Sequence, residues 1–262
     1  MRFTVLPCKS SGLTNPWQFR RGASCGLKSH SSHPLIDVVS KLILFCVIAF
    51  GGLCGVAQAQ TTAAEFIKRG KELLEQKQYY AAGQAFDAAV KLDPSSAEAY
   101  CFRGKLQLDR DKGNADLDKA IELKPDYAEA YYERGLNKDL ANDQAAALRD
   151  YNKAIELNSH FFDAYRTRAV LYLLQRKDAL AIADYTRMIE LKPDGESYYM
   201  RGNSYLEIGQ DAKAIVDLTR SIQLDPTYYW SYMQRAKAYR HLNNFKLAQA
   251  DEMKAAQIGP PK

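Results

Sequence analysis

Residues 195–228 read GESYYMRGNSYLEIGQDAKAIVDLTRSIQLDPTY, and a unit of about this length recurs six times between residue 63 and the C-terminus. A repeat of about 34 residues is typical of stacked helical hairpins, in which each unit buries its apolar face against its neighbours. Two positions keep one kind of residue in every unit: the fourth is aromatic and the eighth is small. The aromatic residues are Phe66, Tyr100, Tyr131, Tyr165, Tyr198 and Tyr232, and the small ones are Gly70, Gly104, Gly135, Ala169, Gly202 and Ala236.

The spacing within a unit predicts two helices. The fourth, eighth and eleventh residues fall at i, i+4 and i+7, which is one face of a first helix. A small eighth residue allows a second helix to come close, and Ala82, Ala147 and Ala181 do the same from the second helix. Helices of roughly 12–14 residues are marginal in isolation, so we expect the hairpins to depend on stacking. Prolines, which cannot continue a helix, close four units at Pro94, Pro125, Pro193 and Pro226.

This pattern resembles the tetratricopeptide repeat family from residue 63 to about residue 260. The resemblance implies an all-α, right-handed superhelical solenoid of about six helix-turn-helix repeats. We place the repeats at 63–96, 97–127, 128–161, 162–194, 195–228 and 229–262.

Three departures from the pattern fall in the second and third units. The second unit lacks about three residues between its helices, near residues 109–112. Gln107 and Lys138 stand at eleventh positions, where an apolar residue is expected, and Ser159 replaces the closing proline of the third unit. We therefore expect the middle of the solenoid to be locally bent or loosened.

The first 59 residues have a different composition and no repeat. They contain six Lys or Arg and one acid, Asp37, followed by an apolar run at 42–56 and then Ala57-Gln58-Ala59. This order predicts a signal peptide cleaved after Ala59, a solenoid over 60–262 and a periplasmic or secreted protein. One alternative is an uncleaved anchor facing the periplasm, although the run is shorter than the roughly 20 residues of a spanning helix. The other is an organelle transit peptide, because residues 1–37 are basic and rich in serine.

The charge of the chain is concentrated in this leader. The whole chain has 36 Lys+Arg and 31 Asp+Glu, of which the leader holds 6 and 1, leaving 30 of each sign in the repeats. A nucleic-acid surface needs clustered positive charge, so we expect no nucleic-acid partner. Cys101 is the only cysteine outside the leader. We expect it to be an inert, partly buried thiol.

The repeats carry no recognisable catalytic motif. Their only histidines, His160 and His241, are far apart and have no cysteine beside them, which argues against a metal site. No glycine-rich phosphate loop, nucleophile elbow or HExxH motif occurs. The sequence therefore predicts a protein that is not an enzyme and that needs no cofactor and no metal.

Arginine occupies the seventh position of every unit, and aspartate precedes the large residue of the second helix in five. A planar guanidinium can hold a carboxylate through two hydrogen bonds, so we expect a ladder of Arg–Asp pairs that joins helices within or between neighbouring units. The alternative is two independent solvated rows. Ala85 interrupts the aspartates in the first unit. The arginines are Arg69, Arg103, Arg134, Arg168, Arg201 and Arg235, and the aspartates are Asp116, Asp150, Asp184, Asp217 and Asp251.

Ligands of the tetratricopeptide repeat family generally lie in a concave groove lined by the first helices. By this resemblance, outward positions of those helices are the candidate protein-binding residues. Trp230 and Tyr199 are the expected anchors, because exposed aromatic side chains commonly anchor interfaces. For Tyr132 and Tyr199, the alternative is packing against the adjacent helix. The candidates are Tyr132, Arg166, Val170, Tyr199, Asn203, Trp230, Met233 and Lys237, with Cys101 as a further outward position.

The resemblance predicts a protein–protein interaction scaffold or assembly adaptor that binds a peptide or helix of an envelope protein. The alternatives are a membrane-tethered adaptor, a regulatory subunit of an enzyme complex and an organellar repeat protein. Membrane contact is expected only if the apolar segment stays uncleaved. In the last unit Glu252 replaces the large apolar residue, which suits a terminal helix with a polar outer face.

Overall fold

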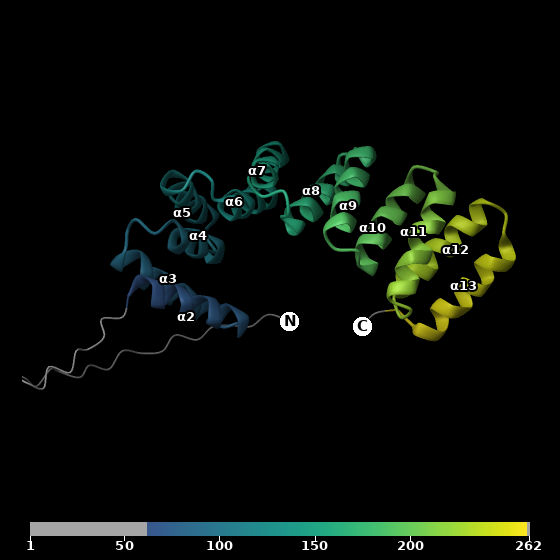
Figure 1. Ribbon diagram of the computed structural model, residues 1–262, viewed down its shortest axis with the longest axis horizontal. Coiled ribbons are helices and arrows are strands. Elements are labelled where there is room, and N and C mark those ends of the chain that lie inside the picture. The colour runs from purple at the N-terminus through teal and green to yellow at the C-terminus, as the bar shows by residue number, and fades with distance from the viewer. Residues whose placement is uncertain (1–61, 261–262) are drawn as a thin grey trace, which may run out of the picture. The chain divides into compact units, whose positions relative to one another are not determined.

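The computed structural model describes residues 62–260, which form twelve α-helices (Figure 1). The predicted signal peptide, its apolar core and its cleavage site lie outside these residues. The helices are α2 (Ala63–Glu75), α3 (Tyr79–Leu92), α4 (Ala97–Leu106), α5 (Arg110–Leu123), α6 (Ala128–Leu140), α7 (Gln144–Leu157), α8 (Phe162–Leu174), α9 (Asp178–Leu191), α10 (Gly195–Glu207), α11 (Asp211–Leu224), α12 (Tyr229–His241) and α13 (Phe245–Ile258).

The helices pair in chain order as six antiparallel helix-turn-helix repeats, from α2 with α3 to α12 with α13. Each helix also contacts the next one along the chain, so every hairpin packs on its neighbours. First helices of adjacent repeats touch as well, as α4 does with α6 and α10 with α12. The predicted all-helical fold of six repeats is confirmed.

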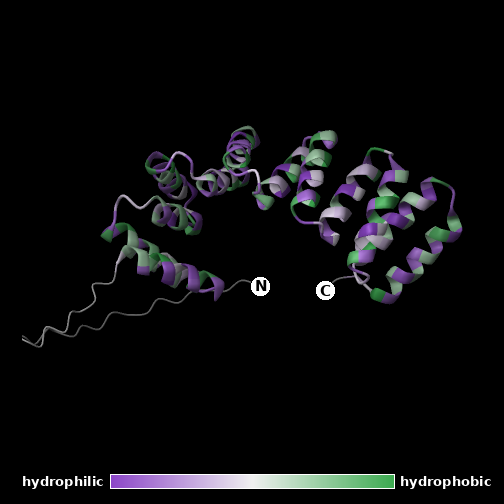
Figure 2. Ribbon diagram, viewed as in Figure 1, coloured by the Kyte–Doolittle hydropathy of each residue, from purple (hydrophilic) through white to green (hydrophobic). Residues whose placement is uncertain are grey.

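Each repeat is amphipathic and closely packed. Hydrophobic and hydrophilic residues are interleaved along the helices (Figure 2), as expected where only one face of a helix is buried. The small eighth residue is a steric requirement in the third repeat: a Cβ atom on Gly135 would lie 2.6 Å from the Tyr151 ring. The large residues opposite these positions are almost fully buried, as at Phe86, Tyr151 and Leu218.

The first helix of the second repeat is shorter than those of the other repeats. This helix, α4, has 10 residues, whereas the other first helices have 13. The prediction that residues are missing is confirmed, but they are missing from the end of α4. Residues 110–112 already belong to α5, which is capped by the side chain of Asp109. The turns of the other repeats contain a residue with positive φ, at Lys77, Asn142, Arg176, Gly209 and Asn243.

The other two departures have different consequences. Lys138 does not loosen the third repeat, because its Nζ lies 2.7 Å from Oδ2 of Asp150. The expectation that a charge at this position weakens the packing was wrong there. At Ser159, between the third and fourth repeats, α7 and α8 share the smallest contact of any consecutive helices among those described.

Candidate functional site

Five arginines of the first helices bind the aspartates of their own repeats. In each pair Nε donates to Oδ2 at 2.7–2.9 Å, and Nη2 donates to Oδ1 at 2.6–2.9 Å. The aspartates are nearly buried, with Asp150 only 4% exposed. The predicted Arg–Asp ladder is therefore confirmed. The pairs are Arg103–Asp116, Arg134–Asp150, Arg168–Asp184, Arg201–Asp217 and Arg235–Asp251.

The same arginines also reach the preceding repeat, through acceptors that sequence reasoning did not name. The third nitrogen, Nη1, donates to an oxygen on the second helix of the repeat before. The acceptor follows the large buried residue of that helix and is Asp, Asn or Thr, a pattern visible in the sequence. Each arginine thus joins two repeats. The acceptors are Asp87 (3.3 Å), Asp118 (2.6 Å), Asn152 (2.6 Å), Thr186 (3.2 Å) and Thr219 (2.9 Å).

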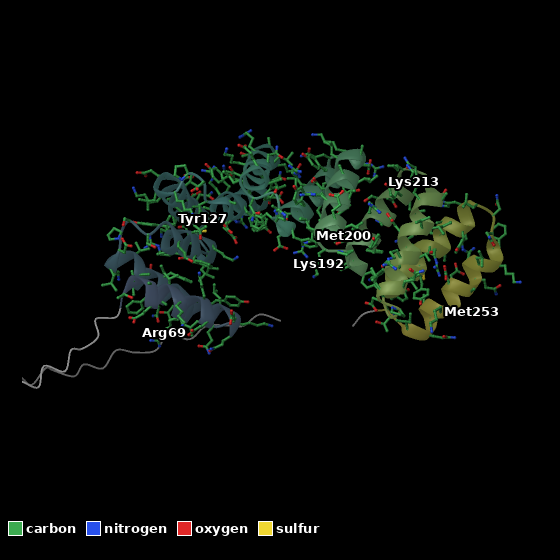
Figure 3. The ribbon with its side chains drawn as sticks, viewed as in Figure 1. Arg69, Tyr127, Lys192, Met200, Lys213 and Met253 are labelled. Carbon is green, nitrogen blue, oxygen red and sulfur yellow. The ribbon has the colours of Figure 1, made fainter. Side chains whose placement is uncertain are left out.

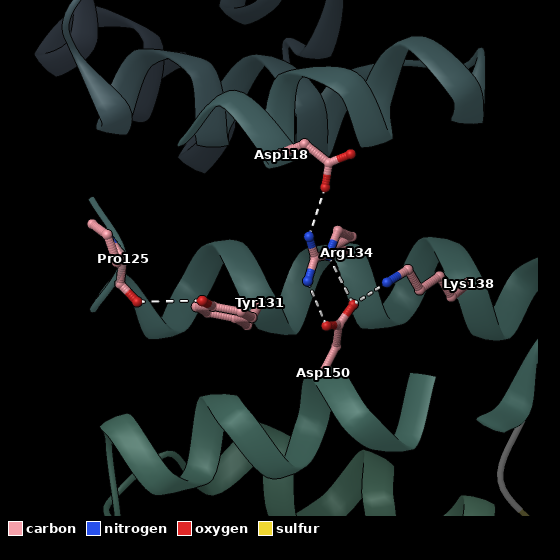
Figure 4. Close-up of polar contacts among 6 residues, drawn as sticks. All are labelled: Asp118, Pro125, Tyr131, Arg134, Lys138 and Asp150. Atoms are coloured by element: carbon pink, nitrogen blue, oxygen red, sulfur yellow. Dashed lines mark hydrogen bonds and ion pairs between the residues drawn. The ribbon is translucent and has the colours of Figure 1, made fainter. Parts of the chain in front are cut away.

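Figure 4 shows one complete unit of this ladder around Arg134. The guanidinium lies between Asp118 of α5 and Asp150 of α7, and Lys138 donates to the same Asp150 carboxylate. The central carbon atom of the Arg134 guanidinium, Cζ, lies 5.4 Å from the centroid of the Tyr131 ring, which is a cation–π contact. The hydrogen bonds that Arg134 donates to Asp150 are the main reason that the pKa of Arg134 is raised. With every nitrogen engaged, the guanidinium has a structural role rather than a ligand-binding one.

The two ends of the ladder differ from the middle. Arg69 in α2 is exposed (Figure 3), and Ala85 stands in α3 where the other five repeats carry the aspartate of the ladder. In α13, Met253 stands where the other second helices carry the residue that accepts from Nη1. Its side chain cannot play that part and is 56% exposed. Glu252 pairs with Arg240 through two hydrogen bonds, of 2.7 and 2.8 Å. The polar character expected at the last repeat therefore includes an ion pair within that repeat.

The eight predicted binding residues lie on α6, α8, α10 and α12, and we call this set the first-helix face. Val170 and Trp230 are the most accessible apolar members, 44% and 42% exposed. Trp230 stands edge-on to Tyr229, with ring centroids 5.0 Å apart. Met233 and Asn203 are half-buried. The structure therefore brings accessible apolar groups to α8 and α12.

The fifth residue of a repeat is covered by the following repeat wherever an aromatic residue stands directly before the first helix of that following repeat. The Tyr132 ring lies 4.9 Å from that of Phe161, and the Tyr199 ring lies 5.1 Å from that of Tyr228. Burial raises the pKa of both Tyr132 and Tyr199. Both tyrosines thus pack against the next repeat, as the alternative interpretation stated. Tyr127 covers Cys101 in the same way.

Cys101 is not an outward residue, so that expectation was wrong. It is 3% exposed and packs among Leu117, Ala120 and Ala130. Burial raises the pKa of its thiol to about 12. Because the thiolate is the reactive form, the expectation of an inert thiol is supported.

The charged members of the first-helix face pair with neighbours on their own side. Arg166 donates to Asp163 one turn earlier in α8, at 3.0 Å. Lys237 of α12 donates to Glu207 at the end of α10, at 3.2 Å. Both remain substantially exposed, with Lys237 at 48%. They are surface ion pairs and contribute at most about 1 kcal/mol each, so a partner can displace them at low cost.

Sequence reasoning missed two exposed leucines at the ends of the same helices. Leu140 ends α6 and Leu174 ends α8, and they are 67% and 68% exposed. Leu174 lies four residues after Val170 and therefore on the same side of α8. The signal in the sequence was an apolar residue at the thirteenth position of the third and fourth units.

Between residues 62 and 260 there is no group of three or more His, Cys, Asp or Glu side chains that could hold a metal ion. No helix in the described part of the chain has both the length and the apolar character needed to cross a membrane.

Comparisons with known proteins agree with this architecture. Residues 141–196 and 195–228 match two family models, each described as a tetratricopeptide repeat. No curated protein matches the chain. Among solved structures, YrrB is described as a TPR protein with an unusual peptide-binding site. It is 22% identical, with a TM-score of 0.60 over 68% of this chain and 94% of its own.

Two further solved structures share the fold. PilF of Pseudomonas aeruginosa is 13% identical, with a TM-score of 0.64 over 76% of this chain and 93% of its own. MamA of Desulfovibrio magneticus RS-1 is 19% identical, with a TM-score of 0.56 over 62% of this chain and 94% of its own. At these identities the likeness concerns the fold alone. Residues 141–228 thus match models of the tetratricopeptide repeat, and the six helical hairpins share the fold of solved structures that include a TPR protein.

Proposed function

We propose that this protein is an interaction scaffold or assembly adaptor that binds a peptide or a helix of another protein on its first-helix face. The observation that carries the proposal is the exposure of Val170, Leu174 and Trp230 on helices whose positions are fixed by the arginine ladder. Exposed aromatic and apolar groups are the usual anchors of protein interfaces. YrrB, which shares the fold, is described as having a peptide-binding site.

The ladder supports this role by keeping the surface preorganised. Each of five arginines holds two repeats together through three hydrogen bonds. A rigid surface loses little conformational freedom when a partner binds, so more of the contact energy appears as affinity. Val170 is the most suitable anchor on α8, whereas Tyr199 already packs on Tyr228.

We further propose that the partner is a protein of the cell envelope. This part of the proposal rests on the basic segment, apolar run and Ala57-Gln58-Ala59 of the leader, which are typical of an export signal. Determining the N-terminal residue of the protein purified from its own cells tests it. Export predicts a chain that begins at Gln60, whereas a chain that retains residues 42–56 supports the tethered adaptor.

The binding surface is tested by pairing first-helix variants with second-helix controls. In-cell crosslinking and mass spectrometry first identify the partner of the tagged chain. The affinity of the purified partner is then measured for the double variant Val170→Ala/Trp230→Ala. The control is Leu180→Ala/Val216→Ala, which truncates two exposed apolar side chains, 48% and 67% exposed, on the second helices α9 and α11.

The two double variants have opposite expected outcomes. The first-helix variant should weaken binding at least tenfold, because truncating an interface anchor costs about 1–2 kcal/mol or more. The second-helix control should leave affinity within about twofold. Equal losses for both variants, or a loss only in the control, would assign the partner to another surface.

A further inference from the structure

The missing turn of α4 leaves a pocket of about 580 Å³ between α3 and the end of α4. Tyr79, Tyr80, Gly83 and Asp87 line it from α3, and Arg103 and Leu108 line it from α4 and the turn that follows. None of these residues belongs to the first-helix face. The pocket is therefore a second candidate site, separate from the one proposed above.

The rim of this pocket is apolar and unusually accessible. Leu108 is 99% exposed and Tyr80 is 82% exposed, the two highest values among large hydrophobic residues between 62 and 260. Tyr79 is 59% exposed. Gly83 has no side chain, and a Cβ atom placed there would have no neighbour within 4 Å, so the pocket is open on this side of α3. Two aromatic rings and a leucine thus surround an open space.

The Asp87 carboxylate, which also lines the pocket, is only weakly paired. Asp87 occupies the ladder position that accepts Nη1, but its distance from Arg103 is 3.3 Å and its side chain is 52% exposed. The equivalent pair in the next repeat, Asp118 with Arg134, lies at 2.6 Å. Arg103 is neutralised by Asp116, which it holds through two hydrogen bonds. Asp87 therefore retains negative charge that faces the pocket.

The corresponding place in the next repeat lies between α5 and the end of α6, and there the first helix has its full length. There α6 continues for one more turn to Leu140, whose carbonyl accepts a hydrogen bond from Arg110 at 3.3 Å. The second repeat lacks this apolar end of the helix. Its counterpart of Lys138 is Gln107, and Lys138 itself pairs with Asp150, the counterpart of Asp116, at 2.7 Å. The pocket thus lacks the apolar group that the following repeat supplies itself.

We propose that the pocket binds a lysine or arginine side chain of a partner protein, with an apolar neighbour resting on Leu108. The cation would pair with the Asp87 carboxylate and lie against the Tyr79 and Tyr80 rings, since cations are attracted to both groups. The charge of Asp87 and the exposed aromatic rings both favour a basic side chain. This partner contact goes beyond the function proposed for the first-helix face.

The test uses the full chain with labelled leucine methyl groups and a defined probe. The peptide acetyl-Leu-Arg-Leu-amide is titrated while the methyl signals of Leu108 are followed by NMR. The matched probe carries citrulline, a neutral isostere, in place of arginine. The arginine peptide should shift the Leu108 signals in a saturable way that weakens with added salt, and the citrulline peptide should bind at least about fivefold more weakly.

Two variants with the same chemistry separate the pocket from a general charge effect. Asp87→Asn removes the charge but keeps an acceptor for Arg103, just as Asn152 accepts from Arg168 at 2.6 Å. It should weaken the arginine peptide about fivefold. Asp118→Asn makes the same change beside α6, which runs one turn further to Leu140, and should leave binding unchanged. Equal affinities for the two peptides, or equal effects of the two variants, would overturn the proposal.

A graft tests whether the missing turn creates the site. Replacing residues 107–109 by the sequence of residues 138–143 restores three residues and should extend α4 into the pocket. Peptide binding to the grafted chain should be lost, with helical content by circular dichroism at least that of the parent. Undiminished binding to a folded graft would also overturn the proposal.

Discussion

Removal of Asp150 should test how strongly the arginine ladder stabilises the repeats. In Asp150→Ala, Arg134 loses two hydrogen bonds of 2.9 and 2.7 Å, and Lys138 loses one of 2.7 Å. Arg134 and Lys138 are 19% and 28% exposed at their side chains, so both charges are partly desolvated. Breaking a buried ion pair costs about 3–5 kcal/mol. Because Asp118 still holds Arg134 and water reaches Lys138, we expect about 2–4 kcal/mol.

The matched control for this experiment is Asp118→Ala, which removes a single bond to the same guanidinium. The Asp118 side chain is 60% exposed, and such surface pairs contribute roughly 0.2–1 kcal/mol. Urea unfolding of both variants and the parent, followed by circular dichroism, gives the comparison. Repeat arrays do not always unfold in one step, so the first transition that responds to Asp150→Ala is the quantity to compare. A loss below about 1 kcal/mol, or one no larger than that of the control, would refute the assignment of a structural role.

Three other predictions follow from packing and burial. Gly135→Ala should destabilise the chain by about 1–3 kcal/mol in urea unfolding, because its Cβ would lie 2.6 Å from Tyr151. Gly83→Ala, with no neighbour within 4 Å, should be neutral or stabilising by up to about 1 kcal/mol, and the reverse order would contradict the packing described. Cys101 should react with iodoacetamide at pH 8 only after denaturant is added, since burial raises its pKa to about 12; fast labelling of the native chain would show that the thiol is accessible. Burial also raises the pKa of Tyr185 from its ordinary value of 10 to about 12, so its contribution to stability is complete below pH 10 and is lost as the pH rises toward 12. Urea midpoints measured between pH 8 and 12 should fall above pH 10, and a constant midpoint would contradict a buried Tyr185.

The repeat fold and the arginine ladder were predictable because both depend on spacing alone. The seventh-position arginines and the aspartates before the large residue, such as Arg168 and Asp184, stand 16 residues apart in four repeats and 13 apart in the second, whose first helix is three residues shorter. In each repeat the two residues hold the same places in the hairpin, which sets the distance between them. The structure confirms both the hairpins and the pairs.

The accessibility of the binding residues was less predictable, because it depends on residues from the next repeat. Tyr132 and Tyr199 occupy outward positions of their own helices, but Phe161 and Tyr228 cover them. Cys101 is covered by the neighbouring repeat in the same way. These contacts require the angle and separation of adjacent hairpins, which the pattern of one unit does not contain.

The pocket beside α3 was also beyond the sequence pattern. The sequence shows how many residues the second unit lacks. It does not show whether the chain shortens the turn between the helices or one of the helices. The structure shows that α4 stops at Leu106 and that Leu108 is left in solvent. The shorter α4 thus accompanies a pocket whose lining includes Leu108.

Site-specific photo-crosslinking in the native cells tests the proposed binding surface most directly. A photoreactive phenylalanine analogue is placed singly at Val170, Trp230, Leu180 and Val216, all exposed residues. We expect one partner band to form from the first-helix positions Val170 and Trp230 and to be absent from the second-helix positions Leu180 and Val216. Crosslinks that form only from Leu180 and Val216, or equally from all four positions, would contradict the assignment of the partner to the first-helix face.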